Sequence, residues 1–510
     1  MTNLIPVPVL LTFFSAAVTL LFPRRPMVHR VISIGSLTGV AVIAASFMVL
    51  TDRYGALALW IGDWPVPLGI SLVVDRLSAL MLFVASIVAL SVLIFSTGQD
   101  KDEIKRETPV SIFHPTFLLL MAGISNAFLA GDLFNLFVGF EIFLFSSYVL
   151  LTLGGTRERI RAGTTYVVVS LLSSTLFLTS LAAIYAATGT VNMAQLSIRL
   201  AQLSEPVQML LQGMLLVTFS IKAAVFPLFS WLPDSYPTAP APVTAVFAGL
   251  LTKVGIYAII RTQTLLFPGS PHTNLLMIAA LLTMVLGILG AFAQVEIKRM
   301  LSFTLVSHLG YMVFGISLAS HAGLAATIYY TAHHITIQAA LFLVTGLIER
   351  RGGTSSLDGL GGLLKASPVL ALLFFVPAMN LGGIPPLSGF IGKVGLLEAG
   401  AQHGGALVWI AMVGGIVTSL LTLMCMAKVW NRAFWGVEPE RTAVEDDEES
   451  DGDDDPRYMP PLMVFATSVL VVFSLALTFF AGPLYGYAER AADSIRDMAY
   501  VSTVLPKGLR

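Results

Sequence analysis

Apolar runs of about twenty residues alternate with short polar or charged stretches along almost the whole chain. A run of this length crosses the ~30 Å hydrocarbon core of a membrane as a helix, because a backbone inside lipid must satisfy its own hydrogen bonds. A membrane barrel would instead alternate apolar and polar residues. The pattern predicts about fourteen spanning helices, at residues 4–22, 31–50, 77–97, 111–130, 134–153, 163–187, 208–226, 243–262, 274–293, 301–320, 324–348, 368–400, 405–428 and 460–482. The sequence therefore predicts an all-α polytopic membrane protein.

Composition agrees with this fold class. The chain is 56% hydrophobic and only 12% charged, with a mean hydropathy of +0.83, whereas an ordinary soluble domain is about a quarter charged. The first apolar run lacks a preceding basic segment and a following cleavage site of small residues, so it predicts a retained helix rather than a signal peptide. We expect the lipid bilayer as the surroundings of the chain and no nucleic-acid partner.

Basic residues are concentrated in alternate loops of this plan. If Arg24 and Arg25 face the cytoplasm, alternation also places there most of the other basic loop residues, including Lys298 and Arg299. Cytoplasmic loops of membrane proteins carry an excess of lysine and arginine. The asymmetry therefore predicts a multi-pass protein of the cell membrane with both termini outside.

Three lysines remain inside predicted spans: Lys222, Lys253 and Lys393. Each lysine near a helix centre costs about 2.5–3.5 kcal/mol on insertion scales. A lysine near a helix end can extend to the lipid headgroups instead, and this alternative applies least to Lys253, which lies far from both ends of its span. We predict that the three face the interior of the bundle, where a lysine without water around it gives up its proton more readily.

Other ionisable residues also lie within apolar runs, among them Glu141, His308, His333 and His334. A carboxylate beside a lysine favours the charged form of that lysine, and a histidine titrates near neutrality and can pass protons. The alternatives are a purely structural ion pair for Glu141 and a packing role for His308. Adjacent residues on a helix point about 100° apart, so only one of His333 and His334 can face a given path squarely.

Proline and glycine interrupt two hydrophobic stretches, residues 226–243 and residues 380–400. Proline removes a backbone donor and fixes φ, so neither stretch can continue as a regular helix. Helices broken at membrane depth line cavities or lie buried in protein, as in many transporters. Since Lys222 precedes one break and Lys393 follows the other, the pattern suggests two related halves.

Other kinds of chemistry lack support in the sequence. The single cysteine, Cys425, rules out a cysteine-ligated iron–sulfur cluster within this chain. The histidines lack metal-site spacing, the string GFIGKV lacks the serine or threonine of a P-loop, and no hydrolytic triad stands out. The acidic segment 445–455 reads as a solvated loop, with ion capture or docking to a basic partner as alternatives. We predict no cofactor, no bound metal and no enzymatic reaction beyond proton movement.

Several segments resemble one known family. Residues 220–259, SIKAAVFPLFSWLPDSYPTAPAPVTAVFAGLLTKVGIYAI, are similar to the D subunit of the Mrp-type multisubunit cation/proton antiporters, whose superfamily includes the antiporter-like subunits of complex I and of membrane-bound hydrogenases. KRMLSFTLVSHLGYM (298–312) and GGIPPLSGFIGK (382–393) fit the same superfamily. The resemblance covers at least residues 110–430. Lysine at position 393 favours the D subunit over a complex I subunit that typically has glutamate there.

The resemblance implies fourteen helices in two inverted five-helix repeats, with the seventh and twelfth helices broken. It divides the chain into helices 1–3 (1–110), a first repeat (111–262), a second repeat (274–430), an acidic cytoplasmic loop (431–459) and a last helix with a tail (460–510).

The resemblance also implies roles for matching residues. Glu141 would pair with Lys222 and bias proton transfer, and Lys253 would be the central relay. His333 or His334 would connect the halves, and Lys393 would end the relay toward the exit. The superfamily often carries a lysine one turn after the histidine of the eleventh helix, where this chain has Gln338, so the link between the halves would rest on histidine and water.

These features predict a proton-translocating subunit of a hetero-oligomeric antiporter that exchanges Na⁺ for H⁺ together with other subunits. A proton-pumping membrane subunit of complex I or of a related hydrogenase is the alternative, and a scaffold whose buried charges only fix assembly is a third. The sequence does not indicate where Na⁺ crosses.

Overall fold

The computed structural model describes residues 2–64, 66, 68–99, 104, 108–269, 272–438, 458–496 and 499–505. The acidic segment 445–455 lies outside the described residues. Within the described part, twelve helices are long and apolar enough to cross a membrane. The chain is therefore a multi-pass, all-α membrane protein, as predicted.

Helices coincide with all the predicted apolar segments. Those of the N-terminal half are α1 (Val7–Leu20), α2 (Pro26–Tyr54), α3 (Arg76–Thr97), α5 (Val110–Leu129), α6 (Leu133–Thr152), α7 (Arg157–Thr188) and α9 (Glu205–Lys222). Those of the C-terminal half are α12 (Thr252–Arg261), α13 (Thr273–Phe292), α14 (Ile297–Ser317), α15 (His321–Gly352), α17 (Pro368–Gly382), α18 (Ser388–His403), α19 (Ala406–Val429) and α20 (Pro461–Phe479). The count of fourteen spans, the inverted repeats and the broken seventh and twelfth helices stay predictions.

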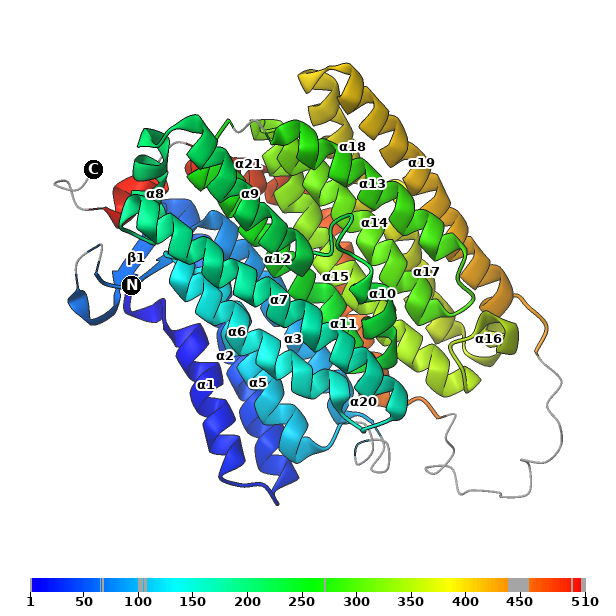
Figure 1. Cartoon of the computed structure of the whole chain (residues 1–510). Helices are drawn as coiled ribbons and strands as arrows, with labels where there is room; N and C mark the ends of the chain where they lie inside the picture. The colour runs from blue at the N-terminus through cyan, green and yellow to red at the C-terminus, as the bar shows by residue number, and fades with distance from the viewer. Residues whose placement is uncertain are drawn as a thin grey trace.

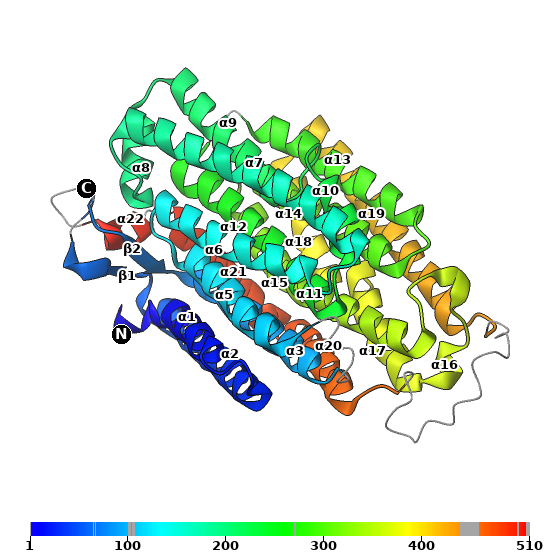
Figure 2. The ribbon, with the colours of Figure 1, turned by 60° about the horizontal axis from the view of Figure 1, so that its bottom comes forward.

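Two apolar helices form the centre of the bundle. One is α15, and the other is the continuous helix of α11 (Ala241–Val246), the π-helical η5 (Phe247–Leu251), α12 and the π-helical η6 (Thr262–Leu266). The apolar windows of both are wholly buried, and α15 packs against α11 and η5. Figure 1 and Figure 2 show α1 and α2 at one edge of the bundle and α19 at the other. Polar groups within these buried windows are thus shut off from lipid.

Short irregular segments follow α9 and separate α17 from α18. The chain leaves α9 at Lys222, and Ala224 has a positive φ of 52°. The next helices are short, α10 (Trp231–Ser235) and η4 (Tyr236–Thr238). Helix α17 ends at Gly382, whose successor Gly383 takes the left-handed conformation at φ 82° that glycine adopts without strain. Lys222 is the last residue of α9, and the ammonium of Lys393 lies at the end of α17.

A small hairpin was missed by the sequence pattern. Strands β1 (Leu57–Trp60) and β2 (Ser71–Val74) pair antiparallel, with Leu57 opposite Val74. Together with η1 (Thr2–Leu4) and the C-terminal α22 (Ala499–Val504), the hairpin lies at one end of the bundle (Figure 2). Four-residue strands offer too few positions for a period of two to stand out.

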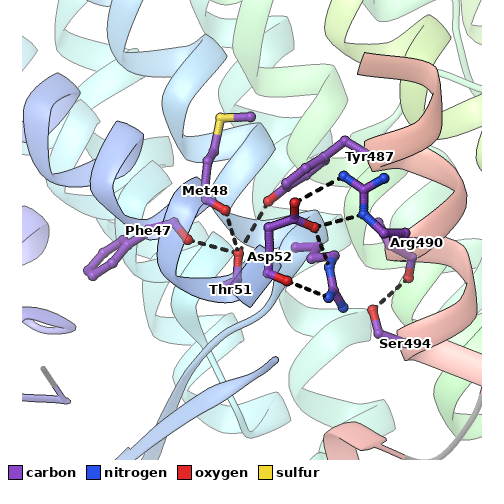
Figure 3. A network of polar contacts seen from close by, with 9 residues as sticks. Phe47, Met48, Thr51, Asp52, Tyr487, Arg490 and Ser494 are labelled. Carbon is purple, nitrogen blue, oxygen red and sulfur yellow. Dashed lines mark hydrogen bonds and ion pairs between the residues drawn. The ribbon is translucent and has the colours of Figure 1, made fainter. Parts of the chain in front are cut away.

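The predicted tail after the last apolar helix contains two helices within its described residues, α21 (Ala481–Arg496) and α22. Helix α21 packs on α15 and α3. Figure 3 shows Arg490 of this helix directed at the Asp52 carboxylate at the end of α2. Asp52 accepts from Arg490 Nε at 2.8 Å, and it also accepts from Arg76 Nε of α3 at 3.1 Å. Tyr487 adds a hydroxyl contact to Thr51 at 3.2 Å. One carboxylate thereby joins α2, α3 and α21.

Candidate functional site

The three lysines singled out from the sequence are buried. Their exposed fractions are 8% for Lys222, 0% for Lys253 and 5% for Lys393. They come from the end of α9, from α12 and from α18. Since a buried ammonium needs hydrogen-bond acceptors or opposite charge, the partners of each lysine define the site.

Lys222 and Glu141 are joined through Ser174 on α7. The Ser174 hydroxyl donates to Glu141 Oε1, and the Lys222 ammonium donates to Ser174 Oγ at 3.3 Å. Within the described chain no direct ion pair links Glu141 and Lys222. The Phe140 ring centroid lies 4.8 Å from Lys222 Nζ, a favourable position for a cation.

A cavity of about 20 Å³ adjoins Lys222. Ser170, Ser173, Tyr166 and Tyr236 are among its lining residues. One water needs roughly 10–15 Å³ of such space and several polar partners. The cavity therefore has room for a water between the Lys222 ammonium and polar side chains of α7.

Lys253 lies on the adjacent helix and has a different kind of partner. Its ammonium donates to the carbonyl of Ala248, inside the π-helical segment η5. Wider turns of this kind are frequent at functional sites. Helices α9 and α12 meet closely, because Gly255 faces the backbone of Ala223, the residue after Lys222. The backbones of α9 and α12 are thus close next to Lys222, although no hydrogen bond joins Lys222 to Lys253 among the described residues.

His334 lies in the buried part of α15. Both of its ring nitrogens are buried and have no hydrogen-bond partner among the described residues. Its ring stacks on His308 with centroids 5.1 Å apart, and His308 Nδ1 contacts the Tyr330 hydroxyl at 2.6 Å. The His334 ring is therefore buried beside His308, and its two nitrogens have no partner among the described residues.

His333 points toward a different group. Its Nδ1 contacts Ser388 Oγ at 2.9 Å, and Asn380 Nδ2 donates to the same hydroxyl at 3.2 Å. The amide of Gly389 donates to Asn380 Oδ1 at 2.8 Å. These contacts hold the start of α18 against α15 and α17. The two adjacent histidines thus face different partners.

Lys393 is held at the end of α17. Its ammonium donates to the carbonyls of Leu381 at 3.0 Å and Gly382 at 3.3 Å, and to Ser419 Oγ at 2.9 Å. The last carbonyls of a helix lack intrahelical partners and carry partial negative charge. The break after α17 therefore supplies the acceptors that a buried lysine needs.

Gln338 takes the place one turn after His334. Its Nε2 donates to the carbonyl of Leu301 on α14 at 2.8 Å, and its Oε1 is buried without a partner in the described part of the chain. An amide can accept and donate but carries no charge. This position therefore supplies hydrogen bonding without a titratable group.

Sequence reasoning missed the hydroxyl and amide groups that contact the candidate residues: Ser174, Ser388, Asn380 and Ser419. The one available signal was the position of Asn380 and Ser388 inside the interrupted stretch 380–400. Serines in an apolar span are otherwise common and uninformative.

Sequence reasoning also missed the buried ion pair of Asp75 and Arg261. Arg261 donates to Asp75 with its two terminal nitrogens at 2.6 and 2.7 Å. The two side chains are 3% and 4% exposed. Burial alone would raise the pKa of Asp75, but the Arg261 charge and hydrogen bonds from Arg261 and Ser78 lower the pKa below its ordinary value.

Known proteins share this architecture. Residues 130–422 match the family described as NADH:quinone oxidoreductase/Mrp antiporter, TM, and residues 60–98 match the complex I chain 5 N-terminus. The D subunit of the Na(+)/H(+) antiporter of Alkalihalophilus pseudofirmus is 40% identical over 99% of this chain and 100% of the relative. The protein of the same name from Bacillus subtilis is 36% identical over 86% of this chain and 88% of the relative.

Solved structures agree. A chain of the Mrp complex from Dietzia sp. DQ12-45-1b has a TM-score of 0.89 and 30% identity and covers 99% of both chains. A chain of respiratory complex I from Thermus thermophilus, at 24% identity, shares the fold with a TM-score of 0.73 over 93% of this chain and 98% of that one. The resemblance to the D-type Mrp chains is confirmed, and this chain belongs to the family of NADH:quinone oxidoreductase and Mrp antiporter membrane subunits.

Proposed function

We propose that this chain is the proton-translocating subunit of a multisubunit antiporter that exchanges Na⁺ for H⁺ across the cell membrane. The observation that carries the proposal is the buried set of Lys222, Lys253 and Lys393, each held by hydroxyl or carbonyl oxygens. Relatives named as antiporter subunits and an Mrp complex of the same fold support a partnership with other subunits. Both termini face outward in this proposal.

The relay begins at the Glu141 end. A neutral lysine accepts a proton and an ammonium donates one, so a proton passes from Lys222 to Lys253 when the first is charged and the second is neutral. The contact of Lys222 with the Glu141 group favours its charged form. Release of that contact lets the proton move on through water toward Lys253.

The second half of the relay uses histidine. His334 accepts a proton from Lys253 and passes it toward Lys393, with Gln338 and water completing the hydrogen bonds. His333 holds Ser388 and so keeps the start of α18 in place. The repeats at residues 111–262 and 274–430 would each supply one end of this relay.

The test uses everted vesicles that contain the whole complex and carry a pH gradient reported by a dye. Addition of Na⁺ should collapse the gradient in wild type. Lys253→Met, which keeps side-chain length without the charge, should abolish the response while the complex still assembles. Lys428→Met is the matched control, because Lys428 lies at a helix end and donates to carbonyls of Phe292 and Gln294. Full exchange in assembled Lys253→Met complex would contradict the relay.

A redox-driven pump is the second candidate, since the shared fold extends to a complex I chain. In that case electron carriers would belong to other chains. Iron and flavin in the purified complex, together with no gradient collapse on adding Na⁺, Li⁺ or K⁺, would favour this candidate over the antiporter.

A further inference from the structure

The Ser174 hydroxyl lies between the Glu141 carboxylate and the Lys222 ammonium and contacts both. It donates to Glu141 Oε1 and accepts from Lys222 Nζ at 3.3 Å. Because no direct ion pair joins the two charged groups among the described residues, the hydrogen-bonded connection between them passes through this one oxygen.

Packing fixes the hydroxyl in this place. Ser173, its neighbour, donates to the carbonyl of Thr218 on α9 at 3.1 Å. One turn further along α7, Phe177 meets Phe219 of α9 edge to face with centroids 4.9 Å apart. Ser174 itself is 6% exposed. The separation of α7 and α9 is thus set on both sides of Ser174, so the hydroxyl stays within reach of Lys222.

A serine hydroxyl can donate one hydrogen bond and accept others at the same time. A proton can therefore cross this bridge in one concerted step. An N–H bond of Lys222 breaks as an O–H bond forms at Ser174, while the original Ser174 O–H bond breaks and an O–H bond forms at Glu141. The ammonium becomes an amine, the carboxylate becomes a carboxylic acid, and the serine is unchanged.

We propose that Ser174 is the bridging residue of the Glu141–Lys222 pair, and that its hydroxyl controls whether Lys222 shares its proton with Glu141 or releases it toward Lys253. The inference rests on the proposed antiporter function. It adds a neutral residue that acts in the relay only through its hydroxyl.

The test compares three variants of the whole complex in the vesicle assay. Ser174→Ala removes the bridge, and exchange should fall about tenfold or more, since a hydrogen bond to a charged group is worth roughly that factor. Ser174→Thr keeps a hydroxyl and should retain exchange. Ser180→Ala on the same helix is the control, because among the described residues Ser180 Oγ donates only to the carbonyl of Leu176 in its own helix. If the alanine variant fails to assemble, Ser174→Cys supplies a weak donor of similar size.

A second comparison separates bridging from packing. In a Glu141→Gln background, Ser174→Ala should cause little further loss, because residues of one network are not additive. Wild-type exchange for Ser174→Ala, equal loss in Ser174→Thr, or a full additional loss in the Glu141→Gln background would each overturn the proposal. Absence of Na⁺-driven exchange in the wild-type complex would instead contradict the proposed function, so the two failures are distinguishable.

Discussion

Gly255 of α12 lies directly against the backbone of Ala223, the residue that follows Lys222. A Cβ at Gly255 would be 2.9 Å from the amide nitrogen of Ala223. Real Cβ atoms do not tolerate such a contact with backbone, so the glycine permits the end of α9 to approach α12. The close approach of α9 and α12 beside Lys222 therefore depends on a residue without a side chain.

Gly255→Ala should separate the two helices and slow exchange about tenfold or more. Alanine is normally favoured over glycine in a helix by roughly 0.5–1 kcal/mol, whereas overpacking costs about 1–3 kcal/mol. The melting temperature of the complex should therefore fall rather than rise. Gly213→Ala on α9 is the control, since its nearest atom would be 3.9 Å away. Unchanged exchange in Gly255→Ala would show that this approach does not matter.

Much of the fold could be predicted because a long, continuously apolar run crosses a membrane as a helix. The predicted span 274–293 is observed as Thr273–Phe292 and the span 77–97 as Arg76–Thr97. Helix α21 was missed because its sequence, AGPLYGYAERAADSIR, mixes apolar and charged residues and resembles a polar tail. Its place is set by contacts to α15 and α3 rather than by its own hydropathy.

The candidate site could be predicted only in part. Lys253 stood out because a charge in an apolar run is costly. Ser174 did not, since a serine in a membrane helix costs little and its neighbours on other helices are invisible in the sequence. The same holds for Asp75 and Arg261, which are 186 positions apart in the chain yet form one buried pair.

Breaking the buried Asp75–Arg261 pair should destabilise the protein strongly. Asp75→Asn keeps an N-cap group for α3 but leaves the Arg261 charge buried and unpaired, which costs about 3–5 kcal/mol. The thermal unfolding of the purified complex should shift well below that of wild type. Asp234→Asn is the control, because the Arg299–Asp234 pair is exposed at 46% and 66% and such pairs contribute about 0–1 kcal/mol. Equal shifts in unfolding temperature for Asp75→Asn and Asp234→Asn would contradict a stabilising role of the buried pair.

Asp132, the N-cap residue of α6, should make stability depend on pH. Burial raises its pKa from the ordinary 3.8 to about 6, so between these values the folded protein binds more protons than the unfolded chain. Stability therefore falls as pH rises through this window, by about 3 kcal/mol in total. Asparagine caps a helix as well as aspartate, so Asp132→Asn should raise the melting temperature at pH 8 and have less effect at lower pH. An unchanged melting temperature of Asp132→Asn at pH 8 would contradict this prediction.

The charge at position 393 should matter for assembly as well as for exchange. Lys393 donates to the carbonyls of Leu381 and Gly382 at the end of α17, and a carboxylate in its place would meet these oxygens without a proton to offer. Lys393→Glu should therefore reduce the amount of assembled complex on native gels. Lys393→Gln keeps amide donors and should assemble nearly as wild type, yet lose exchange because it cannot carry a proton. A glutamate variant that assembled and exchanged like wild type would show that the end of α17 does not select a cation.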